Sequence, residues 1–439
     1  MNRRHRPRWR LLALLMALAL LSAACANDDG DEGSSSGGGD DGGGDQTVTV
    51  FGPEVEQEAQ GFTDSLADFE EETGITIEYQ GDRSFEEQIG VRVDGGDPPD
   101  IAIFPQPGKI RDFQDQLVPL PDDIVETISG SFDEYWVELV TIDGNVYGVP
   151  NKSDLKSLVW YSPEAFAENG YEVPETQEEL LALADQMVAD GNTPFCIGLG
   201  SDAATGWPFT DWMEDYMLRL KGPEVYDQWV NHEIAFDDPQ VVEVGEYVID
   251  LWSREGYVFG GLQNVAATPF AEAGLPILEG DCMMHRQANF YAANWPEGTE
   301  IGEDGQVNAF YLPTFEDQDF GTVVLGGGTY AAAFTDSDAV MEVLRFLSST
   351  EYVETRAAQP VGGFLSANRD QDTSAYVNEI DQTFAEILTS ADPFRFDASD
   401  LMPGAVGAGS FWTAAVDITT GASDVPTAFA EVESSWPSD

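Results

Sequence analysis

Tryptophan residues beside chain-breaking residues are the side chains of this sequence best suited to binding chemistry. Trp207 is flanked by glycine and proline, Trp295 precedes a proline, and Trp412 follows a glycine-rich turn. An aromatic ring in a loop between a strand and a helix can present its face at the mouth of a sheet, where α/β proteins bind ligands. The apolar C–H faces of sugar rings suit such a surface. The alternative is that each tryptophan fills the core.

Polar partners for ligand hydroxyls are found near the same predicted strand ends. Carboxylates and guanidinium groups bind hydroxyls well because a charged partner strengthens the hydrogen bond. A solvated face or a surface ion pair is the alternative for each charged residue taken alone. The candidates are Asp82, Arg83, Gln106, Lys156, Asp211, Arg286, Arg395 and Asp397.

The common enzyme motifs are missing from the sequence. Its three histidines are His5, His232 and His285, and there is no H-E-x-x-H, G-x-S-x-G or P-loop motif. The sequence therefore predicts no catalytic residue, no metal site and no cofactor. A glycosidase needs only two suitably spaced carboxylates, however, and 81 acidic residues offer many chance pairs. A secreted glycoside hydrolase thus remains the alternative function.

The amino-terminal residues 1–24 read as a secretory signal peptide. Five arginines precede an apolar run from Leu11 to Leu21, which is about half the length that a membrane-spanning helix needs. Leu21 to Cys25 resembles the bacterial lipobox, so we expect Cys25 to carry lipid and to anchor the protein at the membrane. Ordinary signal-peptide cleavage, with Cys25 incidental, is the alternative.

Residues 25–46 are rich in Asp, Gly and Ser and predict a disordered, acidic linker. Removing the signal peptide leaves 14 of the 19 basic residues against all 81 acidic ones, a formal charge of about −67. Nucleic acid and anionic lipid are poor partners for so acidic a chain. A high-salt habitat is one origin of such acidity, and composition alone does not decide it.

Two cysteines, Cys196 and Cys282, remain once Cys25 is assigned to the lipid. Disulfides persist outside the cytoplasm, so we expect these two residues to form one. Two buried thiols are the alternative.

Short apolar runs alternate with amphipathic ones from Thr47 onward. Strands are predicted at 48–51, 75–79, 101–104, 158–161 and 195–199, and helices at 54–72, 85–93, 178–188 and 340–347. Thr176 and Glu179 form a capping box for the third of these helices. This alternation predicts parallel strands with crossover helices. The roughly 393 residues from 47 to 439 exceed one ordinary core and suggest two lobes.

Several stretches of residues 47–439 are similar to family 1 extracellular solute-binding proteins, the class that contains the maltose-binding and α-glucoside-binding proteins. Residues 95–101 (GGDPPDI) resemble the turn before the third strand of the first lobe, and residues 144–150 (GNVYGVP) the hairpin before the first interlobe crossing. The α-glucoside branch is indicated by residues 193–198 (TPFCIG), 204–208 (ATGWP), 281–287 (DCMMHRQ) and 394–400 (FRFDASD). Met283-Met284 departs from the bulkier aromatic usual in that branch.

The resemblance implies an α/β, two-lobe periplasmic-binding-protein-like (type II) fold with a hinge and an interlobe ligand cleft. Crossings near 149–151, 313–321 and 360–364 would place 47–150 and 317–361 in lobe 1, and 151–316 and 362–439 in lobe 2. The implied ligand-binding residues are Asp82, Arg83, Phe104 and Gln106 from lobe 1, and Lys156, Trp160, Trp207, Asp211, Arg286, Arg395, Asp397 and Trp412 from lobe 2.

The resemblance also implies a function outside the cytoplasm. The chain would capture a sugar, such as an α-glucoside or another di- or oligosaccharide, by closure of its two lobes. It would deliver the sugar to the permease of an ABC importer and would itself be a monomeric lipoprotein on the cell membrane, not an enzyme. A binding protein for a non-sugar solute is a further alternative.

Overall fold

The computed structural model describes residues 46–437, which lie in the compact unit Gly44–Asp439. The predicted signal peptide, the lipidation of Cys25 and nearly all of the predicted linker fall outside the described residues. Within residues 46–437, every helix is too short or too polar to cross a membrane.

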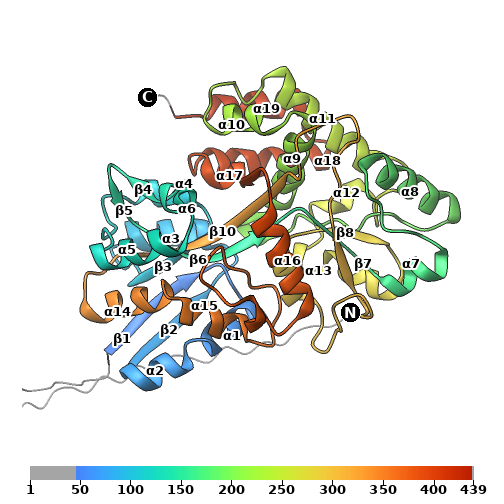
Figure 1. The fold of residues 1–439 in the computed structure, drawn as a ribbon. Coiled ribbons are helices and arrows are strands. Elements are labelled where there is room, and N and C mark those ends of the chain that lie inside the picture. The colour runs from blue at the N-terminus through green and yellow to red at the C-terminus, as the bar shows by residue number, and fades with distance from the viewer. Residues whose placement is uncertain (1–45, 438–439) are drawn as a thin grey trace, which may run out of the picture. The chain divides into compact units, whose positions relative to one another are not determined.

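A six-stranded mixed sheet forms the centre of the first part of the fold (Figure 1). The strand order is β11-β10-β3-β1-β2, and β6 also pairs with β10. β1 is parallel to β2 and β3, as predicted, whereas β10 is antiparallel to β3 and β6. The strands are β1 (Gln46–Gly52), β2 (Ile75–Gly81), β3 (Ile101–Phe104), β6 (Val149–Leu155), β10 (Val324–Ala333) and β11 (Phe394–Phe396).

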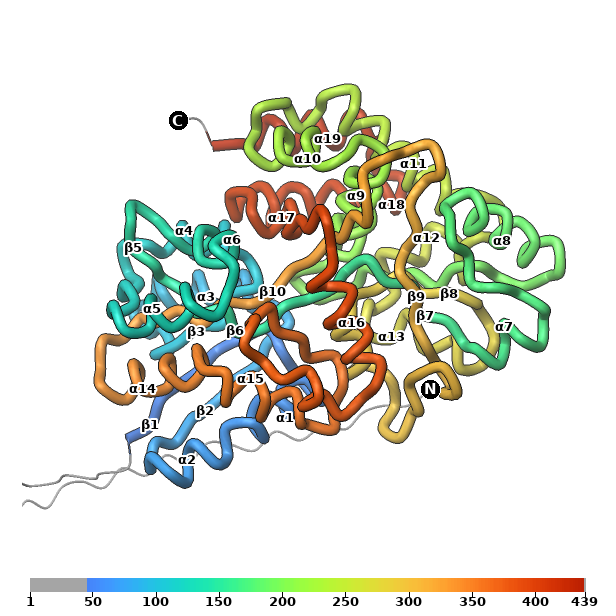
Figure 2. Tube along the Cα trace, viewed as in Figure 1, coloured from blue at the N-terminus to red at the C-terminus, as the bar shows by residue number. Residues whose placement is uncertain are grey.

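β10 brings together segments that are far apart in the sequence. Figure 2 shows this orange strand beside the blue β3 and the green β6. The surrounding helices are α1 (Glu56–Asp64), α2 (Ala67–Thr73), α3 (Phe85–Asp94), α4 (Pro107–Asp112), α5 (Asp122–Ser131), α6 (Glu134–Glu138), α14 (Asp338–Leu347), α15 (Thr350–Ala357) and α16 (Glu379–Ser390), with a short hairpin β4 (Thr141–Ile142) and β5 (Asn145–Val146).

The second part of the fold contains a smaller antiparallel sheet with the strand order β8-β7-β9. Its strands are β7 (Leu158–Tyr161), β8 (Met284–Arg286) and β9 (Asn308–Tyr311). Its helices are α7 (Pro163–Asn169), α8 (Gln177–Asp190), α9 (Trp207–Leu220), α10 (Pro223–Val230), α11 (Pro239–Ser253), α12 (Leu262–Val265), α13 (Phe270–Ala273), α17 (Ala398–Leu401), α18 (Trp412–Thr420) and α19 (Val425–Ser434). Short 3-10 and π segments complete the chain: η1 (Asp202–Ala204), η2 (Leu275–Glu279), η3 (Asn289–Asn294), η4 (Thr373–Ala375) and η5 (Val406–Phe411).

Buried apolar side chains form two cores, and strand β7 contributes to both: Leu158 and Trp160 to the first, Val159 and Tyr161 to the second. Trp160 and Phe384 belong to the first core, and their rings lie 5.8 Å apart. Both residues fall in the segments predicted for lobe 2. The two cores therefore do not divide the chain at the predicted lobe boundaries, which stay a prediction.

Two predicted elements differ from the structure. The single helix predicted at 54–72 is broken between α1 and α2, where the Ser65 hydroxyl donates to the Phe62 carbonyl at 2.6 Å and competes with the helical backbone bonds. The strand predicted at 195–199 is wrong, because this buried stretch forms isolated bridges instead of a ladder. The Phe195, Cys196 and Leu199 amides each donate to a different segment of the chain.

Other predicted elements are confirmed. The strands at 101–104 and 158–161 agree residue for residue with β3 and β7. The Glu179 amide donates to the Thr176 hydroxyl at 3.1 Å, which caps α8. The Glu179 carboxylate accepts from the Glu175 amide and not from Thr176, so the second bond of the predicted capping box is displaced by one residue.

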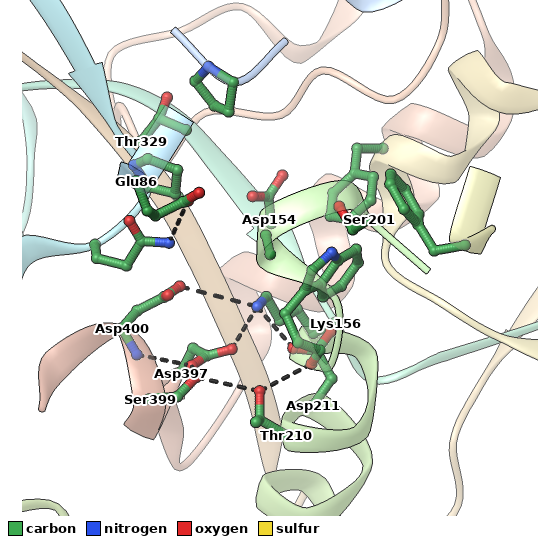
Figure 3. A pocket seen from close by; sticks show the side chains of 18 of the residues that line it. Glu86, Asp154, Lys156, Ser201, Thr210, Asp211, Thr329, Asp397, Ser399 and Asp400 are labelled. Carbon is green, nitrogen blue, oxygen red and sulfur yellow. Dashed lines mark hydrogen bonds and ion pairs between the residues drawn. The ribbon is translucent and has the colours of Figure 1, made fainter. Parts of the chain in front are cut away.

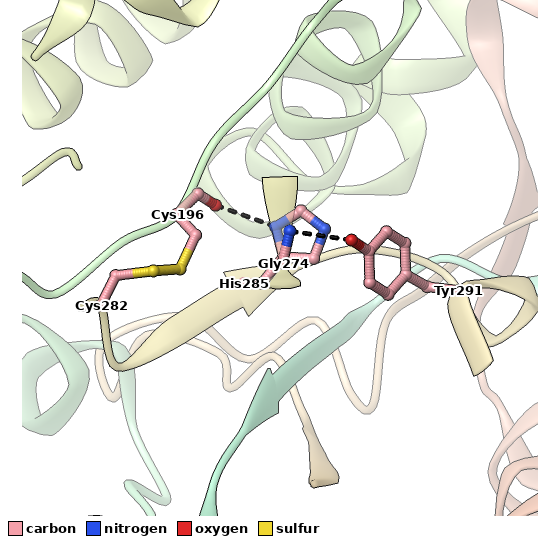
Figure 4. Close-up of a disulfide and its surroundings, with 5 residues drawn as sticks. All are labelled: Cys196, Gly274, Cys282, His285 and Tyr291. Carbon is pink, nitrogen blue, oxygen red and sulfur yellow. Dashed lines mark hydrogen bonds between the residues drawn. A yellow bond between two sulfur atoms is a disulfide. The ribbon is translucent and has the colours of Figure 1, made fainter. Parts of the chain in front are cut away.

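A disulfide joins Cys196 to Cys282, whose Cα atoms are 5.8 Å apart (Figure 4). His285 lies beside it, with Nδ1 2.8 Å from the Cys196 carbonyl oxygen. Burial lowers the pKa of His285 to about 4, so this histidine is neutral at physiological pH. The ring of Tyr291 packs at 4.5 Å from the imidazole. His285 is thus a structural residue of the core.

Candidate functional site

A cavity of about 150 Å³ lies between elements of the two parts of the fold. This volume is roughly ten times what one buried water requires, so the cavity has room for a small organic molecule. Its walls come from the loops after β1, β2 and β3, from β6 and β10, and from the regions around α9, α13, η3, α17 and α18 (Figure 3). The lining residues that matter below are Glu54, Glu58, Arg83, Glu86, Gln106, Lys152, Asp154, Lys156, Trp207, Asp211, Phe270, Phe290, Asp397, Asp400 and Trp412.

Aromatic side chains form one wall of the cavity. Trp207 is the first residue of α9, and the proline that follows it favours the start of a helix there. Its ring lies 4.9 Å from Phe270 and 6.0 Å from Phe290. Trp412 begins α18, and its indole nitrogen is buried with no hydrogen-bond partner among the described residues. This wall offers flat apolar faces to a ligand.

Lys156 holds together a group of aspartates at the base of the cavity (Figure 3). Its Nζ lies 2.9 Å from Asp211, makes a short contact with Asp397, and is 4.0 Å from Asp400. Burial disfavours the charge of Lys156, but the aspartates outweigh it and raise the pKa of the ammonium well above its usual range. Lys156 is therefore a permanent cation at the cavity floor.

The aspartates around Lys156 differ in their protonation. Burial raises the pKa of Asp211 to about 7, even though Lys156 and Arg286 favour the charged form. Burial opposes ionisation of Asp397 as well, but Lys156 prevails and lowers its pKa to about 2. Burial and the neighbouring Asp397 raise the pKa of Asp400. One charged and two more readily protonated carboxyl groups thus share a single ammonium.

A second set of buried ion pairs lies behind the aspartates of the cavity floor and holds them in place. Arg286 binds Asp211 at 3.2 Å and also contacts Asp215, which in turn pairs with Arg219 on the same helix. The Arg219 guanidinium donates to the carbonyl of Pro313 at 3.0 Å. All four side chains are buried. Arg286, Asp215 and Arg219 orient α9 and its cavity-facing Asp211, but these three residues do not line the cavity.

Lys152 forms a second buried charge group on the cavity wall. Its Nζ lies 2.9 Å from Glu54 and 3.4 Å from Glu58, and Arg356 approaches Glu54 at 3.4 Å. Burial opposes ionisation of Glu54, but Lys152 and Arg356 outweigh it and lower the pKa of this carboxyl. The cavity lining therefore contains two lysines, each surrounded by carboxylates.

Three buried oxygen atoms of cavity-lining residues have no hydrogen-bond partner among the described residues: Oε1 of Glu54, Oδ1 of Asp154 and Oε1 of Gln106. Glu54 Oε1 is compensated by the ammonium of Lys152 at 2.9 Å, which leaves the Asp154 and Gln106 atoms. Asp154 Oδ1 forms an ion pair with Lys152 Nζ at 3.8 Å, which is beyond hydrogen-bond distance. Gln106 donates from Nε2 to Glu86 at 2.9 Å and leaves its oxygen free. Unpaired buried acceptors are unfavourable, so both atoms favour a ligand that donates hydrogen bonds.

The structure brings seven of the twelve predicted site residues together on this cavity. These are Arg83, Gln106, Lys156, Trp207, Asp211, Asp397 and Trp412. Arg83 lies over the Phe270 ring with its guanidinium carbon 4.9 Å from the ring centre. The aromatic and the charged candidates thus converge from loops that are distant in the sequence.

The other five predicted residues do not line the cavity. Phe104 points into the first core between Phe85 and Phe113. The Trp160 indole is also buried and donates to the Gln287 carbonyl at 2.9 Å. Both belong to fully buried strands, so their side chains meet core residues and not the loop region at the strand ends.

The three remaining residues are polar and find partners elsewhere. Asp82 accepts from the Ser84 amide at 2.8 Å, which fixes the turn before α3. Arg286 lies behind the cavity floor, as described above. Arg395 forms a two-point ion pair with Asp227 at 2.6 and 2.7 Å, in a separate groove.

Several cavity residues were not predicted from the sequence, among them Glu54, Glu58, Glu86, Lys152, Asp154, Phe270, Phe290 and Asp400. The alternation of lysine and acidic residues along 152–156 was the available signal for Lys152 and Asp154. Among residues 46–437, no group of three or more His, Cys, Asp or Glu side chains has a geometry suited to a metal ion.

Comparison with known proteins identifies close relatives over most of the chain. The osmoprotective compounds-binding protein GgtB of Synechocystis sp. is 39% identical over 395 residues, covering 89% of this chain and 92% of the relative. The α-glucosides-binding periplasmic protein AglE of Rhizobium meliloti is 41% identical over 405 residues, covering 90% and 87%. The solved structure of the bacterial solute receptor AcbH superposes with a TM-score of 0.77 at 18% identity, covering 89% of this chain and 98% of AcbH. This last likeness concerns the fold.

The fold is that of the two-lobe α/β, type II periplasmic-binding class. The family model for bacterial extracellular solute-binding proteins matches residues 52–354, and the chain belongs to this family. It is accordingly a binding protein that acts outside the cytoplasm, and not an enzyme.

Proposed function

We propose that this protein captures a neutral sugar of the α-glucoside class in the cavity and delivers it to the permease of an ABC importer. The observation that carries the proposal is the pairing of an aromatic wall with buried acceptor oxygens that have no partner, such as those of Asp154 and Gln106. A sugar satisfies both at once, because its C–H face stacks on indole and its hydroxyl groups donate to carboxylates.

The charge of the cavity supports a neutral ligand over an anionic one. Seven acidic residues line it, against the three basic residues Arg83, Lys152 and Lys156. All three basic side chains are already paired with carboxylates. A sugar phosphate or a uronate would bring a further negative charge without a free cation to receive it, which is unfavourable in a buried site.

The names of two relatives support the same ligand class. GgtB is described as binding osmoprotective compounds and AglE as binding α-glucosides. Both align with this chain over most of their length.

The remaining features of the proposed function come from the sequence. Residues 1–24 act as a signal peptide, and the lipobox-like stretch ending at Cys25 supports a lipid anchor on the cell membrane. Residues 25–46 then form the tether. The protein works as a monomer that closes on its ligand and needs no cofactor.

Calorimetric titration tests the proposal. The purified protein is titrated with maltose, trehalose, sucrose and methyl α-D-glucoside, with glucuronate as an anionic probe and spermidine as a cationic probe. We expect saturable binding of at least one α-glucoside near micromolar Kd, about −8 kcal/mol, and chromatographic recovery of the unchanged sugar. Binding of spermidine alone, absence of sugar binding, or release of reducing sugar would each contradict the proposal.

A further inference from the structure

Two glycines lie where α4 meets α17, and each is packed against the opposite element. A Cβ atom built on Gly108 of α4 would lie 2.2 Å from the Met402 carbonyl oxygen and 3.0 Å from that of Leu401. A Cβ built on Gly404 would lie 2.6 Å from Oδ2 of Asp112. The oxygens that face Gly108 belong to the backbone and cannot move aside, so glycine at position 108 is what permits the two backbones to approach this closely. The atom that faces Gly404 is the end of the Asp112 side chain, which can move.

This contact, which we call the α4–α17 seam, joins the two cores of the fold. Ile110 of α4 is part of the first core, whereas Ala398, the first residue of α17, and Met402, which follows the helix, are part of the second. Figure 1 shows the two helices as neighbours, and their residues are in contact. The seam is therefore a place where the two parts of the protein touch.

The seam also borders the cavity. Gln106 immediately precedes α4, and Asp400 lies within α17; both side chains line the cavity. Burial raises the pKa of Asp400, and the facing carboxylate of Glu86, which is bonded to Gln106, adds to this effect. The distance between α4 and α17 thus sets how closely the polar groups of the two parts face each other across the ligand.

We propose that Gly108 is a positioning residue for ligand capture: its missing side chain allows α4 to reach α17, and this contact completes the closed form around the ligand. The inference rests on the proposed function. In an open form α4 and α17 are apart, and a methyl group at position 108 contacts no atom of α17. Gly108→Ala therefore disfavours the closed form selectively. A ligand that needs the closed form then binds more weakly in proportion to the lost closed population.

Gly90 supplies a matched control. Gly90 and Gly108 both lie in helices, and neither adopts a positive φ, so alanine is compatible with both backbones. A Cβ on Gly90 would meet no atom within 4 Å. Alanine is the better helix former at either position, so neither substitution is expected to destabilise the ligand-free protein.

The experiment compares Gly108→Ala, Gly108→Val and Gly90→Ala by calorimetry, using maltose, trehalose and sucrose as probes. We expect Gly108→Ala to raise the Kd of the sugar that the wild type binds at least tenfold and Gly108→Val to raise it further, with Gly90→Ala within twofold of the wild type. The ligand-free melting temperatures of Gly108→Ala and Gly90→Ala should agree within about 3 °C. Small-angle scattering at saturating sugar should show less contraction for Gly108→Ala than for the wild type.

Each other outcome overturns the inference. Equal affinities and equal contraction for Gly108→Ala and Gly90→Ala would show that the seam does not govern closure. Loss of cooperative unfolding in ligand-free Gly108→Ala would show that the seam belongs to the ligand-free fold as well. A wild type that binds no sugar would instead contradict the proposed function, so the two failures are distinguishable.

Discussion

At the scale of single residues, the cavity is organised by lysines that are each surrounded by carboxylates. Lys156 faces Asp211, Asp397 and Asp400, and its side chain is 8% exposed. A buried ion pair adds little net stability, but removing one partner leaves buried charge without compensation. The lysine is thus more important for holding the aspartates in place than for attracting a ligand.

Replacing Lys156 tests this role. Lys156→Met should lower the free energy of unfolding by about 3 to 5 kcal/mol, because the charged Asp397 loses its principal partner. Lys221→Met is the control, since Lys221 pairs with the exposed Glu243 and such pairs contribute less than about 1 kcal/mol. Urea unfolding at pH 7 measures both variants. Equal stability of the two would contradict the role assigned to Lys156.

Tryptophans of the cavity wall and of the core should respond oppositely to truncation. Trp207→Ala should weaken sugar binding by about 1 to 3 kcal/mol and leave the ligand-free melting temperature nearly unchanged, because the ring borders the cavity. Trp229 is fully buried in the second core, so Trp229→Ala should cost about 3 to 5 kcal/mol of stability. Calorimetry and thermal melting of both variants check this. A large loss of stability in Trp207→Ala would identify it as a core residue.

Asp381 of α16 should make stability depend on pH. Its buried carboxylate accepts hydrogen bonds from the Gly363 amide and from Asn378, yet burial dominates and raises its pKa to about 6. The folded state thus holds this proton more tightly than the unfolded chain. The contribution of Asp381 to stability is full below pH 4, roughly its unfolded pKa, and is lost as the pH rises to about 6.

Asp381→Asn removes this titration. Relative to the wild type, the variant should gain up to about 3 kcal/mol between pH 4 and pH 7, with the gain complete by about pH 6. Urea unfolding at a series of pH values measures the difference. A difference that does not change with pH would contradict the raised pKa of Asp381.

At the scale of elements, the disulfide closes a loop that contains η1 to η2. The separation of 86 residues predicts a stabilisation of roughly 4 to 5 kcal/mol from restricting the unfolded chain. The double variant Cys196→Ser, Cys282→Ser should lose about that amount in urea unfolding. Thiol titration of unreduced, denatured protein with Cys25 replaced by serine should find no free thiol. Two free thiols would contradict the pairing.

Several elements and cavity residues could be predicted from the sequence because their signals are local. Strand β3 is a short apolar run between chain breaks, and Trp207 is placed by the glycine and proline around it. Strand β6 has only a weaker signal, the alternation of lysine and aspartate along 152–156. The strand is buried over its whole length, so no alternation of buried and exposed positions reveals that Lys152 and Asp154 face the cavity.

Long-range packing explains the residues that could not be predicted. Glu54 is one of 81 acidic residues, and only the approach of Lys152 and Arg356 distinguishes it from a surface carboxylate. Phe104 and Trp160 have the residue types of a binding site, but they lie in strands whose two faces are both covered. The resemblance of sequence motifs identified the region of the site. It did not distinguish residues that line the cavity from residues of the core behind them.

At the scale of the whole molecule, two cores share one cavity, and the chain is strongly acidic, with a formal charge of −62. Because both parts carry excess negative charge, their approach is opposed by repulsion that a neutral ligand does not increase. A ligand in the cavity contacts Gln106 and Asp154 from one part and Trp207 and Asp211 from the other. It makes these contacts together only when the two parts close. Ligand binding and closure are therefore one event in this account.

Small-angle X-ray scattering of the wild type with and without its sugar tests this central claim most directly. The account predicts a smaller radius of gyration in saturating sugar, reached at the same sugar concentrations that saturate the calorimetric signal. Scattering profiles that superimpose with and without a sugar that calorimetry shows to be bound would contradict it.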